Sequence, residues 1–118
     1  EIKRLYNTVL SAQTEALERL REGFPCREAD AVARAIIDGA GYKGCFGHSL
    51  GHGVGMFIHE EPRLSFTWEK TLEPGQIVTV EPGIYLEGKF GVRIEDMVYV
   101  TEEGSLNLTA SEKKLIVL

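Results

Sequence analysis

The residues IVTVEPG, at positions 77–83, place a glutamate between a short apolar run and a Pro-Gly pair. The run 77–80 follows the turn signal LEPGQ at 72–76, so it predicts a strand that Pro82 and Gly83 terminate. An unpaired buried carboxylate costs several kcal/mol, and Glu81 at the end of a central strand therefore needs a cation or several hydrogen-bond donors. Glu81 is the first candidate for a functional residue.

A second strand, predicted at 91–101 after a loop centred on Gly88, combines apolar and charged residues in the same way. Its even-numbered apolar residues share one face, namely Val92, Ile94, Val98 and Val100. Arg93 and Glu95 lie together on the other face, and Asp96 points away from them. The alternative is that this second face points into solvent and carries a hydrated Arg-Glu pair.

Two helices are predicted before the strands. From 2 to 20 the apolar residues recur with the i, i+3, i+4 spacing of one helical face, up to a glycine and a proline that close the helix. A shorter amphipathic helix is predicted at 27–38 and ends at two glycines. The other predicted elements are a turn at 102–104 and a last short strand at 114–118. The fold class is therefore α/β or α+β.

All three histidines, His48, His52 and His59, lie in the glycine-rich stretch GHSLGHGVGMFIHEEP at 47–62. Glycines interrupt this stretch, so we expect an extended or looped backbone rather than a helix that presents two histidines on one face. Imidazole is the commonest metal ligand and a general acid or base near neutral pH. A single histidine here would be interpreted as structural, but three together favour a site. A phosphate loop is disfavoured because neither GK[ST] nor GxGxxG occurs.

A histidine combined with two glutamates favours zinc, manganese, cobalt or iron over calcium. One histidine with Glu81 and Glu95 can hold one ion with an open position, whereas a pair of ions needs about two more carboxylates. The chain's aspartates are Asp30, Asp38 and Asp96, and none of them is a convincing further ligand. From the residues alone, the donor set for two ions is incomplete.

The composition excludes several other classes of function. The net charge is −5 and no run of lysine or arginine suggests a nucleic-acid or membrane surface, so neither partner is expected. No apolar stretch is long enough to span a bilayer and no signal peptide is recognisable, so we expect a cytoplasmic protein. Cys26 and Cys45 have no zinc-ribbon spacing and are interpreted as reduced, with a disulfide as the minority alternative.

Three runs of sequence, in this order, resemble one known family: HSLGHGVGMFIHEEP, LEPGQIVTVEPGIY and GVRIEDMVYVT. The chain is similar to the C-terminal half of the catalytic domain of the pita-bread metallopeptidases, most of all their Xaa-Pro branch, which includes aminopeptidase P and prolidase. The resemblance extends over nearly all of residues 1–118. It implies half of a pita-bread (creatinase/aminopeptidase) fold, in which two N-terminal helices pack on a curved, mainly antiparallel sheet. The missing N-terminal part would precede residue 1.

The resemblance also implies roles for individual residues. Family members bind two divalent ions, usually manganese or cobalt, through two Asp, one His and two Glu. By this match the metal ligands are His52, Glu81 and Glu95, with Glu95 bridging the ions and Glu81 also acting as general base. His48 and His59 line the substrate site, and His59 stabilises the tetrahedral intermediate. Arg93 supports the bridging carboxylate. The two aspartate ligands have no counterpart in this chain.

The implied activity is metal-dependent hydrolysis of the bond before proline, in peptides with proline at the second position. We expect the parent to be a metallopeptidase and a homodimer, and the 118 residues alone to be inactive and to bind metal weakly or not at all. Two alternatives share the fold. One is a non-catalytic peptide-binding module, and the other is a metal-free, creatinase-like amidinohydrolase. A third alternative is an α+β domain without a site.

Overall fold

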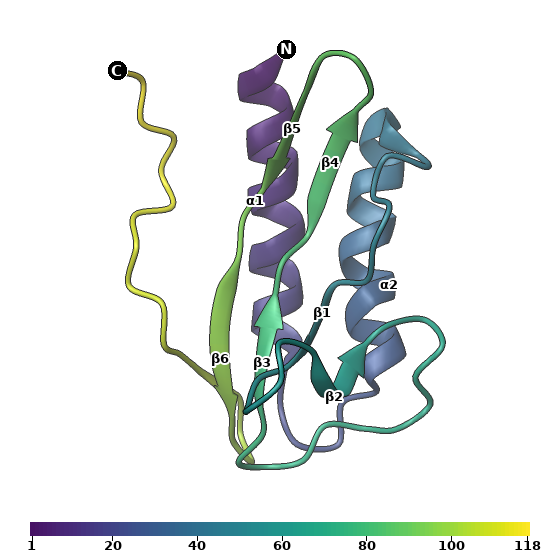
Figure 1. The fold of residues 1–118 in the computed structure, drawn as a ribbon, viewed down its shortest axis with the longest axis vertical. Coiled ribbons are helices and arrows are strands. Elements are labelled where there is room, and N and C mark those ends of the chain that lie inside the picture. The colour runs from purple at the N-terminus through teal and green to yellow at the C-terminus, as the bar shows by residue number, and fades with distance from the viewer.

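Two helices open the chain in the computed structural model, which describes all of residues 1–118. Helix α1 spans Ile2–Arg19 and helix α2 spans Cys26–Ile37, and the two pack side by side (Figure 1). The predicted helices are confirmed with ends shifted by one residue. A short π-helical turn, η1 (Asp38–Tyr42), extends α2 until Gly41, whose φ of 96° lies in the left-handed region and ends the helical path.

Seven short strands follow the helices: β1 (Gly51–Gly53), β2 (Glu60–Leu64), β3 (Ile77–Val80), β4 (Gly83–Leu86), β5 (Phe90–Arg93), β6 (Asp96–Val100) and β7 (Ser105–Asn107). Five of them form one sheet in the order β2-β1-β3-β6-β7, and β4 pairs with β5. Every pairing is antiparallel. The expected α+β arrangement of two N-terminal helices on an antiparallel sheet is confirmed.

The hydrophobic core lies between the helices and the sheet (Figure 1). Helix α1 contacts β3, β4 and β5, and helix α2 contacts β2. On α1 the buried residues Leu5, Val9, Ala12 and Ala16 form the apolar stripe that the sequence predicts. The helices cover one side of the strands, so side chains on the other side are free to form a site.

The strand predicted at 91–101 is wrong as a single element. The structure divides it into β5 and β6, which pair with different strands. The strand predicted at 77–80 is confirmed as β3, but Gly83, which was expected to help terminate it, begins β4. The cause is Pro82, which has no N–H to donate and so interrupts the ladder on its own strand. Two short ladders, β3–β6 and β4–β5, therefore replace one long pairing.

The register is the same on both sides of this interruption. Val80 faces Asp96 in the ladder before it, and Gly83 faces Arg93 in the ladder after it. Two residues on each strand remain between these pairs, so Glu81 lies opposite Glu95 and Pro82 lies opposite Ile94. We call these four residues the ladder gap. Its position places both candidate glutamates at one point of the molecule.

The strand predicted at 114–118 is also wrong. The edge of the sheet is taken by β7, and the residues after 109 run beside α1 and belong to no strand (Figure 1). Among the polar contacts of this segment, Lys113 Nζ lies 2.6 Å from the buried Asp96 Oδ1, and Tyr6 donates a 3.0 Å hydrogen bond to the Lys113 carbonyl. None of the helices combines the length and apolar character that a membrane crossing requires.

Candidate metal and substrate site

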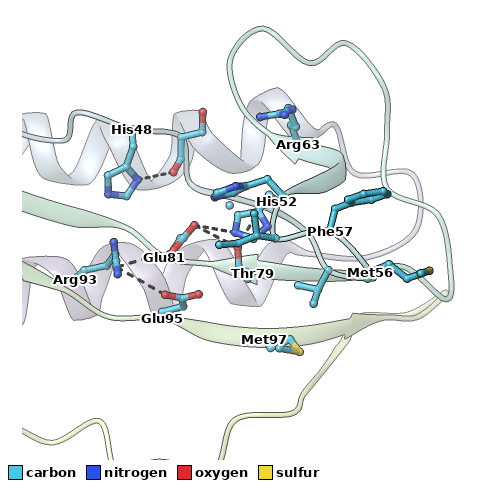
Figure 2. Close-up of a pocket in the computed structure, with 16 residues that line it drawn as sticks. His48, His52, Met56, Phe57, Arg63, Thr79, Glu81, Arg93, Glu95 and Met97 are labelled. Atoms are coloured by element: carbon cyan, nitrogen blue, oxygen red, sulfur yellow. Dashed lines mark hydrogen bonds and ion pairs between the residues drawn. The ribbon is translucent and has the colours of Figure 1, made fainter.

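An open pocket of ≈ 950 Å³ lies on the sheet side that the helices leave uncovered (Figure 2). It brings together the candidate site residues of the sequence analysis, which are His48, His52, His59, Glu81, Arg93 and Glu95. They come from β1 and its flanking loops, from the ladder gap and from the end of β5. Residues more than 40 positions apart in the sequence thus share one cavity.

His52 is positioned by the close approach of β1 to its neighbours. A Cβ at Gly51 would collide with the backbone carbonyl of Thr79, and a Cβ at Gly53 would collide with the carbonyl of Glu61. The two glycines therefore let β1 enter the sheet between β2 and β3. The amide of His52 donates to Thr79 Oγ1 at 3.1 Å, which fixes the backbone beneath the imidazole.

The hydrogen bonds of His52 determine which ring nitrogen carries the proton. Nδ1 lies 2.9 Å from the carbonyl oxygen of Gly53, and because a carbonyl only accepts, Nδ1 is the donor. In the neutral ring Nε2 then carries a lone pair, and it faces Glu81 Oε1 at 3.4 Å. Two acceptors at this distance are favourable only with a cation or a proton between them. Metal-binding histidines commonly donate their other N–H to a backbone carbonyl in this way.

Glu81 and Glu95 face each other across the ladder gap, and the guanidinium of Arg93 lies beside both. Arg93 Nε is 4.0 Å from Glu81 Oε2 and 3.7 Å from Glu95 Oε2 (Figure 2). Like charges directly opposite on two strands are destabilising. Burial raises the pKa of Glu81, the charge of Glu95 and a hydrogen bond with it raise it further, and His52 and Arg93 oppose the change.

The predicted metal ligands meet in pairs and not as one set. His52 contacts Glu81, and Glu81 contacts Glu95, but no group of three or more His, Cys, Asp or Glu side chains is arranged so that it could hold a metal ion. The side chain of Glu81 is 14% exposed and that of Glu95 is 42% exposed, so both are open to the pocket. The chemistry of the donors fits a divalent cation, while their number is short of a complete cage.

His48 is held from both sides of its ring. Nδ1 donates to the Ser49 carbonyl at 2.8 Å, so Nε2 accepts a 2.7 Å hydrogen bond from the hydroxyl of Tyr85 on β4. The imidazole also packs edge-on against Phe46, with ring centroids 5.1 Å apart. These contacts leave the face of the ring as the surface that His48 presents to the pocket.

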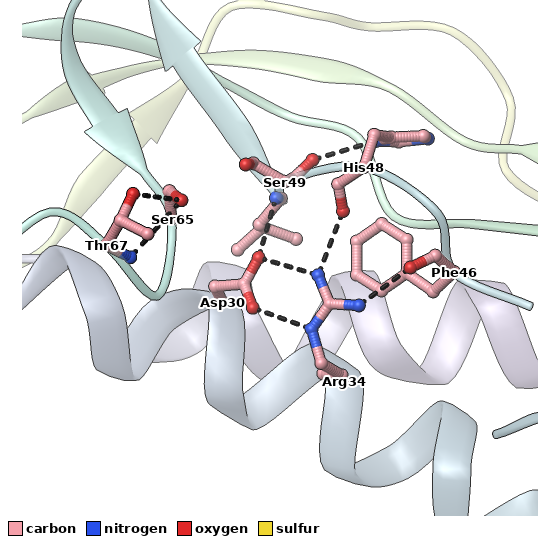
Figure 3. Close-up of polar contacts among 8 residues, drawn as sticks. Asp30, Arg34, Phe46, His48, Ser49, Ser65 and Thr67 are labelled. Atoms are coloured by element: carbon pink, nitrogen blue, oxygen red, sulfur yellow. Dashed lines mark hydrogen bonds and ion pairs between the residues drawn. The ribbon is translucent and has the colours of Figure 1, made fainter. Parts of the chain in front are cut away.

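The loop that carries His48 is fastened to helix α2 by a buried ion pair (Figure 3). Arg34 donates from Nε and Nη2 to the two carboxylate oxygens of Asp30, and it also donates to the carbonyls of Phe46 at 2.7 Å and His48 at 2.9 Å. Asp30 in turn accepts the amide of Leu50 at 3.0 Å. One Asp-Arg pair therefore satisfies three backbone groups of the loop.

His59 lies beside His52, with their ring centroids 4.5 Å apart, and is exposed at the mouth of the pocket. It follows the three most exposed apolar residues of this region, Met56, Phe57 and Ile58, which are 97%, 73% and 84% exposed. The histidine and these three residues all line the pocket, and Figure 2 shows Met56 and Phe57 among them. We call residues 56–58 the apolar tip.

The sequence analysis missed four residues that hold the site in place, namely Gln13, Asp30, Arg34 and Tyr85. Gln13 and Asp30 are polar but fall within the apolar stripes of α1 and α2, and both are buried. A polar residue on a buried helical face needs hydrogen-bond partners, so this position was a usable signal. Tyr85 belongs to the strand β4 that the sequence analysis did not predict.

Comparison with known proteins places the chain among peptidases. The family model described as metallopeptidase family M24 matches residues 1–102. The chain is 47% identical over 118 residues to the uncharacterized peptidase YqhT of Bacillus subtilis, covering 100% of this chain and 33% of that protein. It is 47% identical over 114 residues to a Xaa-Pro dipeptidase of Pyrococcus furiosus, covering 97% and 33%.

Solved structures agree with the sequence matches. The structure of a Xaa-Pro dipeptidase from Bacillus anthracis superposes with a TM-score of 0.96 at 51% identity, covering 99% of this chain and 33% of that one. The chain thus has the fold of one third of these proteins, which confirms the expected part of a pita-bread fold. It spans about a third of the length of the relatives it matches.

Proposed function

The chain belongs to metallopeptidase family M24, and from this premise we propose that it supplies part of the active site of a metal-dependent peptidase that hydrolyses the bond before proline. Identities of 47% and 51% to proteins named Xaa-Pro dipeptidase support this specificity. The observation that carries the proposal is the lone pair of His52 Nε2 directed at Glu81, with Glu95 directly across the ladder gap.

His52, Glu81 and Glu95 would hold the metal, and manganese or cobalt suits this mixture of imidazole and carboxylate. Bound divalent ions lower the pKa of water and polarise a carbonyl oxygen, which is the chemistry that peptide hydrolysis needs. A two-ion site requires about two further carboxylates beyond these three residues. We propose that they come from the part of the relatives' length that this chain does not cover.

The remaining residues have roles that follow from where they lie. Glu81 is the least exposed carboxylate of the pocket and is the group that accepts the proton of the attacking water. Arg93 places a positive charge beside Glu81 and Glu95 and so reduces the repulsion between the two carboxylates. His59, at the open rim, donates to the developing oxyanion of the substrate carbonyl.

His48 contributes to the choice of substrate. Its ring nitrogens are both engaged, so it offers the peptide a flat ring face instead of a free donor. The amide nitrogen of proline in a peptide carries no hydrogen, so a site specific for proline must recognise its ring and not an N–H group. A ring face that packs on the pyrrolidine ring meets this requirement.

The experiment that tests the function is a chimera. The matching 114 residues of the Pyrococcus furiosus Xaa-Pro dipeptidase are replaced by this chain, and hydrolysis of Ala-Pro is compared with hydrolysis of Ala-Ala in the presence of Mn²⁺ or Co²⁺. We expect activity on Ala-Pro only. His52→Ala, Glu81→Gln and Glu95→Gln should each reduce it by at least about 100-fold, while the exposed Glu102→Gln retains it.

Other outcomes would support the alternatives. A folded chimera that binds two equivalents of metal but hydrolyses neither dipeptide would contradict the peptidase assignment and favour a peptide-binding module. A chimera that binds no metal would instead favour the metal-free amidinohydrolase class. Metal content measured by elemental analysis separates these two results before any kinetic assay.

We also propose a cytoplasmic location and a homodimer for the parent protein. Both cysteines, Cys26 and Cys45, are free in the structure, which is compatible with a reducing compartment. Sedimentation of the intact parent protein tests the dimer, and fractionation of cells tests the location.

A further inference from the structure

Gln13 is a buried polar residue of α1 that points into the sheet. Its side chain is 1% exposed, and Nε2 donates to two backbone carbonyls, that of Val80 at 3.1 Å and that of Ile94 at 3.2 Å. Carbonyl oxygens only accept, so the amide nitrogen and not the oxygen must face them. The orientation of this side chain is therefore determined by its partners.

The two acceptors lie at the ladder gap. Val80 immediately precedes Glu81, and Ile94 immediately precedes Glu95. Outside the two ladders, one backbone hydrogen bond crosses the gap, from the Ile94 amide to the Pro82 carbonyl at 3.3 Å. Gln13 thus bridges the two strands where the regular pairing is interrupted and where the two carboxylates project.

We propose that Gln13 is a positioning residue that sets the separation of the Glu81 and Glu95 carboxylates by clamping the carbonyls before them. Few hydrogen bonds fix the backbone where the ladders are interrupted, and a shift of the Val80 or Ile94 peptide moves the side chain that follows it. Because Gln13 Nε2 donates to both carbonyls, the positions of the two carboxylates both depend on this one nitrogen of α1. The importance of this clamp for metal binding rests on the proposed function.

The test compares Gln13→Met with Val9→Ala in the 118-residue chain. Methionine keeps the length of the side chain but has no donor, whereas Val9 lies one turn earlier on the same buried face and has no polar side-chain atom to lose. Gln13→Asn is a milder variant that keeps the amide but shortens the reach. Amide hydrogen exchange by NMR and Co²⁺ affinity by calorimetry are measured for each variant.

With Gln13→Met we expect exchange at the Glu81 and Ile94 amides to rise at least tenfold while amides of α2 are unchanged, and Co²⁺ affinity to fall roughly 10- to 100-fold. Val9→Ala should raise exchange only in amides that open by global unfolding and leave the affinity unchanged. Equal exchange patterns in the two variants would overturn the clamp. If the wild-type chain binds no Co²⁺, as its incomplete donor set allows, the exchange pattern alone decides the clamp, and the chimera described above tests the metal site separately.

Discussion

Cys26 is fully buried at the start of α2, and this burial raises the pKa of its thiol from 9.0 to about 11. In the unfolded chain the thiol loses its proton above pH 9, but in the folded chain it does so only above pH 11. The stability that the neutral thiol contributes is thus fully present below pH 9 and is lost as the pH rises through this window.

We therefore expect the free energy of unfolding of the wild type to fall by about 2 kcal/mol more than that of Cys26→Ala between pH 8 and pH 10.5. Urea unfolding at both pH values measures the difference. Cys45→Ala provides the control, because it removes the other thiol of the chain, which is only half-buried. An identical pH dependence in wild type and Cys26→Ala would show that burial of this thiol does not affect its titration.

The Asp30-Arg34 pair is expected to be costly to break. Asp30 is 1% exposed and Arg34 is 30% exposed, so Arg34→Met leaves a buried carboxylate without its charge partner and frees two carbonyls. We expect a loss of about 3 kcal/mol in urea unfolding. Arg19→Met removes a pair of the same i, i+4 spacing on the surface, and it should cost less than about 0.5 kcal/mol.

A second measurement on the same variants tests whether the loop that carries His48 has moved, independently of the change in the free energy of unfolding. The ring protons of His48 should shift in the NMR spectrum of Arg34→Met, because the loop loses its contact at the His48 carbonyl. Arg34→Lys keeps the charge but cannot reach both carbonyls, and it should show a smaller shift. Unchanged His48 signals in Arg34→Met would mean that the loop is held by other contacts.

The residues that form the pocket could be chosen from the sequence, whereas the residues that support them give a weaker signal. Histidines and glutamates stand out because few of them occur in apolar or glycine-rich surroundings. Gln13 and Asp30 stand out only if the buried face of each helix is known precisely enough to place a polar residue on it. Gln13 binds backbone carbonyls and Asp30 binds a backbone amide, and the sequence does not indicate which backbone groups these are.

At the level of elements, the close approach of β1 to β3 depends on Gly51. Gly51→Ala would drive a methyl group into the Thr79 backbone, which belongs to the central strand β3 and cannot move aside. We expect a loss of about 3 kcal/mol in the free energy of unfolding. Gly47→Ala lies four residues earlier with open space around it and should be nearly neutral. A mild effect of Gly51→Ala in urea unfolding would contradict the close approach.

Pairing of strands is where prediction from the sequence fails. The alternation at 91–101 correctly places Arg93 and Glu95 on one side, but it cannot show that Pro82 on another strand divides this segment into β5 and β6. The strand β4 was missed because Pro-Gly was interpreted as an end, whereas the glycine begins a new ladder opposite Arg93. Local patterns specify a strand, and only the partner specifies its limits.

For the whole molecule, exposed apolar side chains predict self-association. The apolar tip is a run of three consecutive exposed residues, and single domains rarely expose such a run unless another surface covers it. We expect the 118-residue chain to self-associate in sedimentation experiments, and serine at positions 56–58 to weaken the association at least about tenfold. Serine at the exposed residues 116 and 117 is the comparison. A monomeric wild type at high concentration would refute the expectation.

The overall architecture followed from two features of the sequence, the helical stripes and the motifs shared with a known family. Hydrophobic periodicity was sufficient for α1 and α2 because each buries one continuous face. The prediction of a strand at 114–118 was wrong because hydrophobic residues alone do not determine whether a segment finds a strand partner. Four of the five residues are apolar, but the sheet edge that they would need is occupied by β7, and the edge that a strand joins depends on the rest of the molecule.

The position of Arg93 has a practical consequence for the choice of denaturant. Its guanidinium group lies beside both Glu81 and Glu95, and dissolved guanidinium ions offer the same planar set of donors at molar concentration. Guanidinium chloride would therefore compete for these oxygens, and screen them, before the chain unfolds. An unfolding transition recorded in guanidinium chloride would therefore include the binding of guanidinium ions in the pocket as well as unfolding. An uncharged denaturant such as urea reports on unfolding alone.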